Sequence, residues 1–392
     1  MIYQKLIFFL KSFTILFKFW KKYKDLDIIF YYPSHFNRGT PPSNRYFEPM
    51  YRACINSGLS YLIIEEPSSK FSKRDLNALP FDNLFYLVIL LRKLFPQILF
   101  DSFESREWFI GRLFKKTILR GLRFKNCIVL SNSMTGFFRG LSPQAKIYDY
   151  QHGLISSDHT GYFLGKDLPD HIKLNQTNLL LFGEGFTNLV QKYDSSNYYA
   201  KHAFTIGCTN YQIHPGNNLK KFILFSLQFS EKNNDKDNLH FQFIKSLLSQ
   251  LEKALSNKNI VLLLKHHPRY EFQLEESLFT YPFTRIYQNN LDQALEKSFL
   301  HITLNSTSTF DAARFGIPTI LVKNPFFTAE PYSKEFKYPI PLVNDNELGD
   351  ALVGIIENIQ IYESYSKAAQ EWVKKFYQPF DNLKFCKLIS ES

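Results

Sequence analysis

Short apolar runs alternate with longer segments of helical spacing from residue 27 onward, and this alternation constrains the fold more than any other feature. Apolar runs of this kind have the length of buried strands, and a helix between two of them brings the chain back so that the strands pair in parallel. The pattern therefore predicts an α/β protein with parallel sheets. In the first half we expect strands over 27–32, 61–66, 97–101, 126–131, 146–150 and 178–183, with helices over 46–57 and 83–94.

A polar stretch, TNYQIHPGNNLKK, interrupts the pattern, which then starts again. In the second half we expect strands over 222–227, 260–265, 300–304 and 318–322, with helices over 239–257, 346–358 and 363–376. A chain of 392 residues also exceeds what one hydrophobic core usually serves. We therefore predict two Rossmann-like domains that face each other across a cleft. Their expected bounds are 25–208 and 222–360, with a linker over 209–221 and closing helices over 361–392 that could pack back on the first domain.

Residues 1–24 have the spacing of an amphipathic basic helix. Its longest uncharged run has six residues, far below the ~20 that span a bilayer. Such a helix is typical of a segment that lies in a membrane interface, with its lysines near anionic headgroups. The alternative is an ordinary helix packed on the domain that follows. The apolar face would hold Ile2, Leu6, Phe9, Phe13, Leu16 and Trp20, and the opposite face Gln4, Lys11, Lys18 and Lys22.

The formal net charge of +11 is unevenly distributed. The segments 1–24 and 111–125 each carry six basic residues and no acid, so the rest of the chain is close to neutral. Two basic patches on a near-neutral body argue against nucleic acid as the partner. The second patch, with Arg112, Lys116 and Arg120 at spacings of four, could extend a membrane contact or form a solvated helix face. The four cysteines lie far apart without a CxxC pair, which fits a reducing cytosol.

The first candidate loop, QHGLISSDHTGYF, follows the expected strand 146–150. In such sheets ligands bind beyond the carboxyl ends of strands, where His152 would lie, and an imidazole can take a proton from a hydroxyl near neutral pH. Gln151 precedes it, and Gly153 could turn with positive φ or let the chain pass close to a ligand. The alternative is a structural His–Asp pair that braces the loop. The candidates for orienting His152 are Asp149, Asp158 and His159.

The second candidate loop, LLLKHHPRY, ends the expected strand 260–265. Four groups able to carry positive charge meet there, and such a cluster repels itself unless an anion is bound. Phosphate is the natural ligand. Pro268 would hold the direction of the backbone. A solvent-facing basic turn is the alternative. The four groups are Lys265, His266, His267 and Arg269.

The third candidate loop, LNSTSTFDAARFG, follows the expected strand 300–304. Four consecutive hydroxyl residues precede a helix, whose first N–H groups favour an anion. Asp311, in the first turn, could cap the helix or accept hydrogen bonds from ribose. The helix should end near Gly316, a C′ glycine that can adopt a left-handed conformation, and Pro318 then reopens an extended strand. A plain N-cap is the alternative. The hydroxyl residues are Ser306, Thr307, Ser308 and Thr309.

At these residues the sequence resembles bacterial GT-B glycosyltransferases that build surface polysaccharides. The closest groups are the capsule sialyl- and Kdo-transferases that use CMP-sugars, and the teichoic-acid glycerophosphotransferases that use CDP-glycerol. The resemblance is carried by His152-Gly153, by His267-Pro268 and by the hydroxyl run 306–309, over about 145–325. The stretch LFGEGFTNLV, which contains Glu184, is also similar to the segment before their interdomain linker. Two departures are the Asp311-Ala312 pair, where Glu-Ala is usual, and the lack of a clean acidic motif for a carboxylate base.

The resemblance implies an inverting transferase that needs no metal and no cofactor, because the nucleotide-sugar is itself a substrate. The donor phosphate would be bound by Lys265, His267 and the hydroxyl run, and His152 would deprotonate the acceptor hydroxyl. The acceptor would be a growing surface polysaccharide or lipid-linked glycan. The protein would be peripheral, on the cytoplasmic face of the inner membrane, held there by 1–24, and 111–125 could extend that contact.

Two other functions fit the same sequence less closely. A non-hydrolysing sugar-nucleotide 2-epimerase shares the two-domain architecture, but the apolar and basic amino terminus does not suit it. A basic membrane- or nucleic-acid-binding protein would use the +11 charge, but it would leave the His-Pro and hydroxyl loops without a role.

Overall fold

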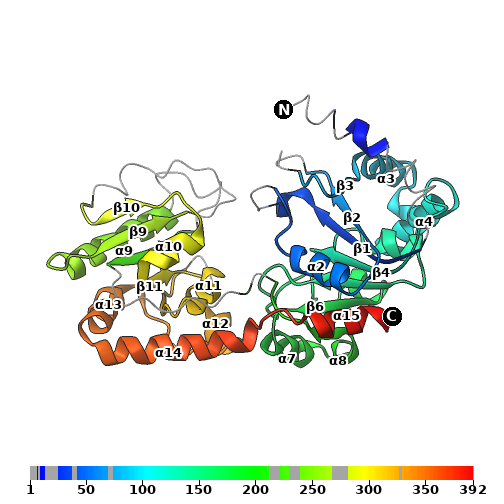
Figure 1. The fold of residues 1–392 in the computed structure, drawn as a ribbon. Helices are drawn as coiled ribbons and strands as arrows, with labels where there is room; N and C mark the ends of the chain where they lie inside the picture. Colours follow the sequence, from blue (N-terminus) through cyan, green and yellow to red (C-terminus); the bar gives the residue numbers. More distant parts are fainter. Residues whose placement is uncertain are drawn as a thin grey trace. The chain divides into compact units, whose positions relative to one another are not determined.

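The computed structural model describes residues 7, 9–13, 25–37, 42–68, 74–209, 211, 221–228, 239–266, 281–325 and 329–391. The chain forms two compact α/β units (Figure 1). The first consists of Met1–Tyr211 together with Tyr377–Ser392, and the second of Gln212–Phe376. Each contains a parallel sheet, so the expected class with two Rossmann-like domains is confirmed. Most of the expected linker, residues 210 and 212–220, lies outside the described residues.

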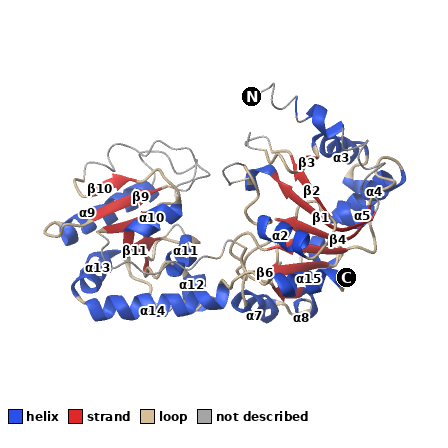
Figure 2. Ribbon diagram, viewed as in Figure 1, coloured by secondary structure: helices blue, strands red, loops and turns tan. Residues whose placement is uncertain are grey.

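The first unit is built on a seven-stranded sheet in the order β3-β2-β1-β4-β5-β6-β7, drawn in red in Figure 2. Every neighbouring pair is parallel. Five of the six expected strands are present, and the short β3 and β7 were not expected. The strands are β1 (Asp25–Pro33), β2 (Tyr61–Glu66), β3 (Leu79–Pro80), β4 (Arg123–Leu130), β5 (Lys146–Tyr150), β6 (Thr177–Leu181) and β7 (Ala203–Thr205).

The strand expected over 97–101 is wrong. The structure has a single 3-10 turn there, η2 (Gln97–Leu99), between two helices. Its apolar side chains face solvent instead of a core, since Ile98 is 90% exposed and Leu99 is 64% exposed. A short apolar run predicts a strand only if a neighbouring strand is available, and this one follows Pro96 at the tip of a helical hairpin.

Alternate side chains of β1 sort the helices of the first unit into two layers. The Phe30 ring lies 5.1 Å from the ring of Phe47 beside α2, whereas the next residue, Tyr31, lies 5.6 Å from Phe81 and 4.9 Å from Phe138 on the other side. Helices α2 and α15 therefore cover one face, and α3, α4 and α5 the other. Their bounds are α2 (Glu48–Asn56), α3 (Asp82–Leu94), α4 (Phe103–Lys116), α5 (Thr135–Leu141) and α15 (Asn382–Ser390). The helices near the far edge of the sheet are α6 (Asp170–Lys173), α7 (Glu184–Tyr193) and α8 (Tyr199–His202).

The last part of the chain returns to the first unit. Backbone hydrogen bonds run from Cys208 N to Gln378 O (2.7 Å) and from Asp381 N to Ile206 O (2.8 Å). Between them Gly207 has a φ of +91°, and a Cβ there would lie 2.1 Å from the oxygen of Pro379. Only glycine fits this position. Helix α15 then buries Phe385 and Ile389 against the sheet side that carries α2.

The second unit has a five-stranded parallel sheet in the order β10-β9-β8-β11-β12. All four expected strands are present, and β10 was not expected. The strands are β8 (Phe222–Ser226), β9 (Val261–Lys265), β10 (Thr284–Ile286), β11 (Ser298–Thr303) and β12 (Thr319–Leu321). The helices are α9 (Leu239–Leu255), α10 (Leu291–Lys297), α11 (Ser308–Arg314), α12 (Glu330–Lys334), α13 (Leu348–Glu357) and α14 (Ile359–Phe376).

The closing helices are divided between the two units. Helix α14 packs within the second unit, where the ring of Trp372 lies 4.5 Å from that of Phe310 and its Nε1 donates to the oxygen of Phe336 (2.6 Å). Helix α15 packs within the first unit. The segment 361–392, expected to behave as one group of helices, therefore contributes to both cores.

Only part of the expected amino-terminal helix lies among the described residues. Residues 7 and 9–13 are helical. The hydroxyl of Ser12 donates to the oxygen of Phe9 (2.7 Å) and accepts from the backbone N–H of Asn83 at the start of α3 (3.1 Å). In the basic patch 111–125, Arg112 and Lys116 lie on α4, but Arg120 lies in the turns after it, so the expected ladder loses its last member. Within the part of the chain that the structure describes, no helix is both long and apolar enough for a bilayer crossing.

Candidate functional site

Both sheets reverse their strand order near the middle, and ligands of such sheets bind beyond the carboxyl ends of the strands at that reversal. In the first unit the reversal lies between β1 and β4, and in the second between β8 and β11. The third candidate loop, which holds the hydroxyl run 306–309 and is called the hydroxyl loop below, follows β11 and lies directly at the second reversal. The His152 loop follows β5, which is the neighbour of β4. The sequence-predicted loops therefore lie at the edges where this architecture binds ligands.

His152 is held at the carboxyl edge of the first sheet by its neighbours. Gln151 is fully buried, donates from Nε2 to the oxygen of Gly153 (2.9 Å) and accepts at Oε1 from the first backbone N–H after β6 (2.9 Å). The hydroxyl of Tyr46 donates to the backbone oxygen of His152 (3.2 Å), and the ring of Phe36 stands edge-on to the imidazole at 5.3 Å. The imidazole is half-buried, at the end of a rigid strand.

The exposed side chains of the same loop bond within it. Asp158 accepts from the hydroxyl of Ser156 (2.5 Å), and Nδ1 of His159 accepts from the backbone N–H of Gly161 (3.1 Å). These contacts shape the turn. The orienting role expected for Asp158 and His159 remains a prediction.

Asp149 is a buried anchor beneath the loop. One carboxylate oxygen accepts from the backbone N–H of Asn132, and the other from the hydroxyl of Tyr162, each at 2.9 Å. Burial raises the pKa of Asp149 to about 7. Asp149 thus ties the segment after β4 to the far end of the His152 loop.

Gly153 and Glu184 flank the same edge. Gly153 does not have a positive φ, so that expected reason for a glycine is wrong. A Cβ there would meet no atom within 4 Å, which leaves the space beside the strand end open. Glu184 is exposed in the first turn of α7, directly after β6.

Sequence reasoning missed a polar cluster at the reversal of the first sheet. Glu66, the last residue of β2, accepts from the hydroxyls of Tyr31 (2.8 Å) and Ser133 (2.7 Å), and burial raises its pKa. Asn132 and Met134, on either side of Ser133, have φ values of +52° and +58°, which are uncommon for residues other than glycine. The signal in the sequence was the pair of acids that ends the strand 61–66.

A cavity of about 320 Å³ opens beside this strained segment. Arg92 donates to both carboxylate oxygens of Glu107, at 2.9 and 2.7 Å, and forms one wall. The lining also includes Phe103, Glu104, Asn132, Met134, Thr135, Gly136 and His171. Carboxylates, an amide and an aromatic ring around one cavity suit a ligand rich in hydroxyl groups.

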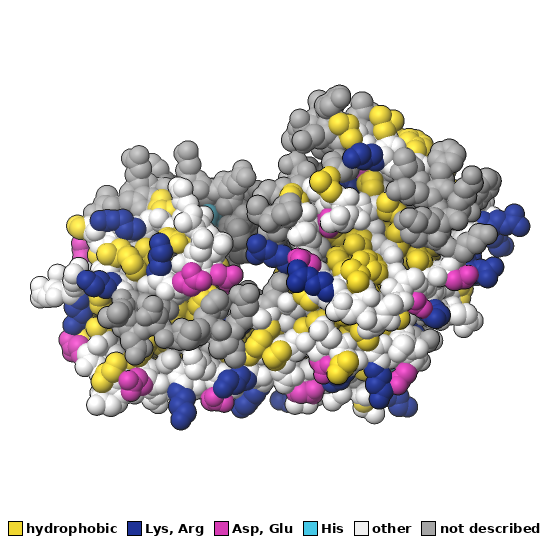
Figure 3. All heavy atoms as spheres, viewed as in Figure 1, with side chains coloured by type: hydrophobic (Ala, Val, Ile, Leu, Met, Phe, Trp, Pro, Cys, Tyr) yellow, Lys and Arg dark blue, Asp and Glu magenta, His cyan; other side chains and the backbone are white. Residues whose placement is uncertain are grey.

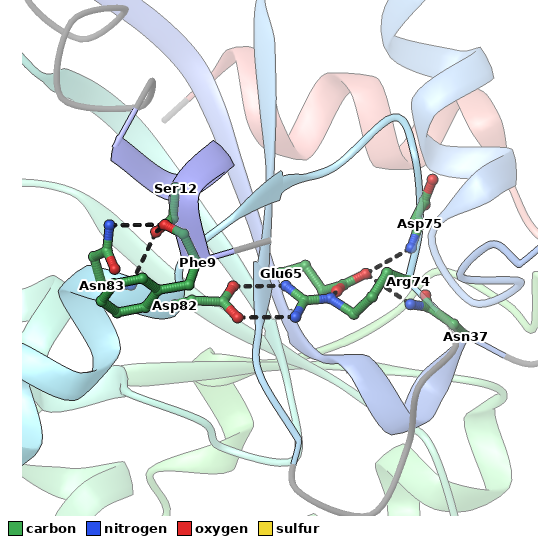
Figure 4. A network of polar contacts seen from close by, with 8 residues as sticks. All are labelled: Phe9, Ser12, Asn37, Glu65, Arg74, Asp75, Asp82 and Asn83. Carbon is green, nitrogen blue, oxygen red and sulfur yellow. Dashed lines mark hydrogen bonds and ion pairs between the residues drawn. The ribbon is translucent and has the colours of Figure 1, made fainter. Parts of the chain in front are cut away.

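A second missed network braces the loops after β1 and β2 (Figure 4). The guanidinium of Arg74 bonds to Glu65 and forms two hydrogen bonds to Asp82, at 3.0 and 2.8 Å. Glu65 also accepts from Asn37 Nδ2 (2.7 Å) and from the backbone N–H of Asp75 (2.9 Å). Burial raises the pKa of Glu65, although Arg74 opposes the shift. The carboxylates of Glu65 and Asp82 are both bonded to side chains or backbone of this unit, which indicates a structural role for the network.

In the second unit, Lys265 lies close to the hydroxyl loop. It pairs with Ser226 on β8, and Ser226 pairs with Thr303 on β11, so the ends of β9 and β11 are two strand spacings, about 10 Å, apart. The ammonium of Lys265 donates to the oxygen of Asn289, and burial lowers its pKa. His266 follows and is half-buried. The expected phosphate ligands His267 and Arg269, with Pro268, lie outside the described residues.

The hydroxyl run 306–309 is divided by the start of α11. Ser308 and Thr309 begin the helix and are buried, whereas Ser306 and Thr307 remain accessible in the loop. Two hydrogen bonds hold the loop in place. The hydroxyl of Tyr332 donates to the backbone oxygen of Ser306 (2.7 Å), and Oε1 of Gln228 accepts from the backbone N–H of Asn305 (2.7 Å). The accessible hydroxyls are therefore half of those expected.

Asp311 and Gly316 mark the first turn and the end of α11. Asp311 forms an ion pair with Arg314 (3.1 Å), and burial raises its pKa to about 6. Gly316 has the expected left-handed conformation at the end of the helix, with a φ of +68°. The predicted contact of Asp311 with ribose remains a prediction.

A buried histidine lies beneath the hydroxyl loop and was not predicted. Nδ1 of His301 lies 2.9 Å from the hydroxyl of Thr319, and Nε2 lies 2.9 Å from that of Ser226 and 3.3 Å from that of Ser308. Burial lowers the pKa of His301 to about 3, so the imidazole is neutral. It connects β8, β11, β12 and α11 under the candidate anion site.

Comparison with known proteins identifies the fold. No family model and no curated protein sequence matches the chain. Similar solved structures include the S. aureus MnaA-UDP co-structure, with 14% identity, coverage of 94% of this chain and 96% of that chain, and a TM-score of 0.56. The UDP-GlcNAc 2-epimerase from Methanocaldococcus jannaschii has 13% identity, coverage of 93% and 99%, and a TM-score of 0.56. The glycotransferase of kitacinnamycin has 8% identity, coverage of 94% and 99%, and a TM-score of 0.55. These likenesses show a GT-B fold of two Rossmann-like domains.

Proposed function

We propose that the protein is a glycosyltransferase that moves a sugar from a nucleotide-activated donor to a growing surface polysaccharide or lipid-linked glycan. The observation that carries the proposal is the edge of the second sheet. The accessible hydroxyls of Ser306 and Thr307 lie at the strand-order reversal between β8 and β11, where nucleotides bind in this architecture, and Lys265 lies one strand further along the same edge, at the end of β9. Such a set suits a diphosphate or phosphodiester.

His152 supplies the base in this proposal. The acceptor hydroxyl gives its proton to the imidazole while its oxygen attacks the anomeric carbon. The bond from that carbon to the donor phosphate oxygen breaks, and the nucleotide leaves with the electron pair, so the configuration inverts. Cationic and hydroxyl groups of the second unit stabilise the charge on the leaving phosphate.

The cavity beside Asn132 is a candidate subsite for the acceptor. It belongs to the same edge as His152, and its lining combines Arg92, the amide of Asn132 and the aromatic ring of Phe103. The donor in this proposal is a CMP-sugar, as the sequence motifs imply, and the reaction uses no metal. The names of two similar structures contain UDP or UDP-GlcNAc, so UDP is the other nucleotide to test.

A thermal-shift panel of CMP, CDP, UDP and GDP tests the donor, because a nucleotide that binds only the folded state raises the melting temperature. We expect one nucleotide to stand out and the matching nucleotide-sugar to be consumed only when a glycan acceptor is present. Conversion of UDP-N-acetylglucosamine to its 2-epimer without an acceptor would instead make the protein an epimerase, in line with the similar UDP-GlcNAc 2-epimerase from Methanocaldococcus jannaschii. No shift with any nucleotide would refute both.

A further inference from the structure

The helical hairpin formed by α3, η2 and α4 exposes a row of apolar side chains. Tyr86, Leu90 and Leu94 recur every four residues on α3 and are all exposed. The chain then turns through Ile98 and Leu99, which are also exposed. We call these five side chains the α3 ridge. The ridge lies on the side of the sheet opposite to α2 and α15.

The described amino-terminal residues extend the ridge. Phe9, Leu10 and Phe13 are exposed, and the ring of Phe9 lies 6.4 Å from that of Tyr86. Asn83 fixes the segment by donating from Nδ2 to the oxygen of Phe9 (3.0 Å). On the face drawn in Figure 3, hydrophobic and basic side chains lie together at the upper end of this unit. An exposed apolar row of this length marks an interaction surface.

The exposed charges around the ridge are basic, with the exception of Asp101. Lys93 falls on the ridge side of α3, seven positions after Tyr86, and is exposed. On α4, Arg112 and Lys116 are exposed on the side that begins with Phe109, whose ring contacts Phe95 at the end of α3 (5.0 Å). Between residues 76 and 120 the acids are Asp82, Asp101, Glu104 and Glu107, and all but Asp101 are buried.

We propose that the α3 ridge docks the protein on an anionic phospholipid surface. The axis of α3 would lie in the plane of the interface, with the leucines and Ile98 among the acyl chains and the lysines and arginine at the phosphates. At the boundary between lipid headgroups and hydrocarbon, apolar side chains can enter the hydrocarbon while neighbouring cations contact the headgroups. The α3 ridge has this combination, because most of the acidic residues near it are buried. A second copy of the chain fits less well, because pairing this face with itself would bring Lys93, Arg112 and Lys116 together with their own copies.

This inference goes beyond the proposed sugar transfer. It makes a folded part of the first unit the docking element, in addition to the amino-terminal helix expected from the sequence. Vesicle binding is measured without donor or acceptor, so its failure and a failure of the transferase assignment are separate results.

The test is co-sedimentation of the full chain with mixed phosphatidylcholine and phosphatidylglycerol vesicles, compared with pure phosphatidylcholine. We expect binding to the mixed vesicles that weakens with added salt. The variant Leu90→Glu with Leu94→Glu should bind at least about tenfold more weakly. The matched control is Ile55→Glu with Leu383→Glu, which changes two exposed residues on α2 and α15 at the opposite face of the sheet and should bind like the parent. Unchanged melting temperatures verify that both variants fold.

A ridge variant that binds like the parent would overturn the proposal and leave the amino-terminal helix as the sole anchor. So would a parent chain that ignores vesicles but dimerises in light scattering, with the ridge variant monomeric, because the ridge would then be a protein interface. A second measurement uses Leu94→Trp. Its fluorescence should shift to shorter wavelength with mixed vesicles and be quenched by brominated acyl chains, and no change in the presence of bound vesicles would contradict docking through α3.

Discussion

The two units place opposite chemistry at the same edge of similar sheets. In the first, the strands end in the carboxylates of Glu65, Glu66 and Asp149, of which Glu65 and Asp149 are buried, and each accepts a hydrogen bond from a neighbouring loop. In the second, the corresponding edge carries Lys265 and the loop hydroxyls above a neutral histidine. The comparison teaches that strand order fixes where a ligand can bind, while the loops decide its charge. The first edge suits hydroxyl groups and proton transfer, and the second suits an anion.

The largest expected effect is on the chemistry of the first edge. His152→Ala should lower the transfer rate by about 10²–10⁴-fold, which is the usual contribution of a general base. His159→Ala, in the same loop, should lower it by less than about tenfold, because its ring supports the turn. Initial rates with the nucleotide-sugar found in the thermal-shift panel would measure both. Equal losses would show that the loop acts as a whole and that His152 has no special role.

The next effect contrasts the ion pairs of the two units. Arg74→Ala would leave Glu65 and Asp82 buried without their cation and should cost about 3–5 kcal/mol of unfolding free energy. Arg314→Ala removes the ion pair with Asp311, and because the Asp311 side chain is 28% exposed the change should cost on the order of 1 kcal/mol. Urea unfolding monitored by circular dichroism would measure the free energy of unfolding of the two variants. A larger loss from Arg314 would mean that the Figure 4 network is not the main brace of the first unit.

Two glycines of the first unit provide a smaller contrast. Gly207→Ala forces a left-handed conformation and a clash with Pro379 and should cost about 2 kcal/mol or more. Gly153→Ala meets no atom within 4 Å and should leave the melting temperature unchanged. Thermal unfolding distinguishes them. If Gly153→Ala nevertheless lowers acceptor affinity, the open space beside His152 is used by the substrate.

The last contrast is a pair of opposite pH dependences, one in each unit. The unfolded chain releases the Asp149 proton near pH 3.8 and the folded chain near 7, so raising the pH through this window destabilises the first unit. For His301 the unfolded pKa is 6.5 and the folded pKa about 3, so lowering the pH through that window destabilises the second unit. Each slope is at most about 1.4 kcal/mol per pH unit. Asp149→Asn and His301→Gln should each flatten one slope of the calorimetric midpoints and leave the other, and a loss of both slopes in either variant would contradict the assignment.

The fold was more predictable from sequence than the site. Periodicity located β2 and β5 at their observed bounds, because buried parallel strands are continuous apolar runs. The same logic failed at 97–101, where the apolar residues cover no core but form the tip of the α3 ridge. The loop at 151–163 was found because polar residues follow a strand. The Arg74 network and the position of His301 could not be found, since their partners are brought together only by folding.

The first unit is discontinuous in sequence, because its final helix follows the whole second unit. During synthesis, residues 1–211 emerge from the ribosome before the segment that buries Phe385 and Ile389 against them exists. The surface around α2 must therefore stay uncovered until the whole second unit has been synthesised, while the second unit can fold as a continuous segment. A chaperone would have most to shield during that interval.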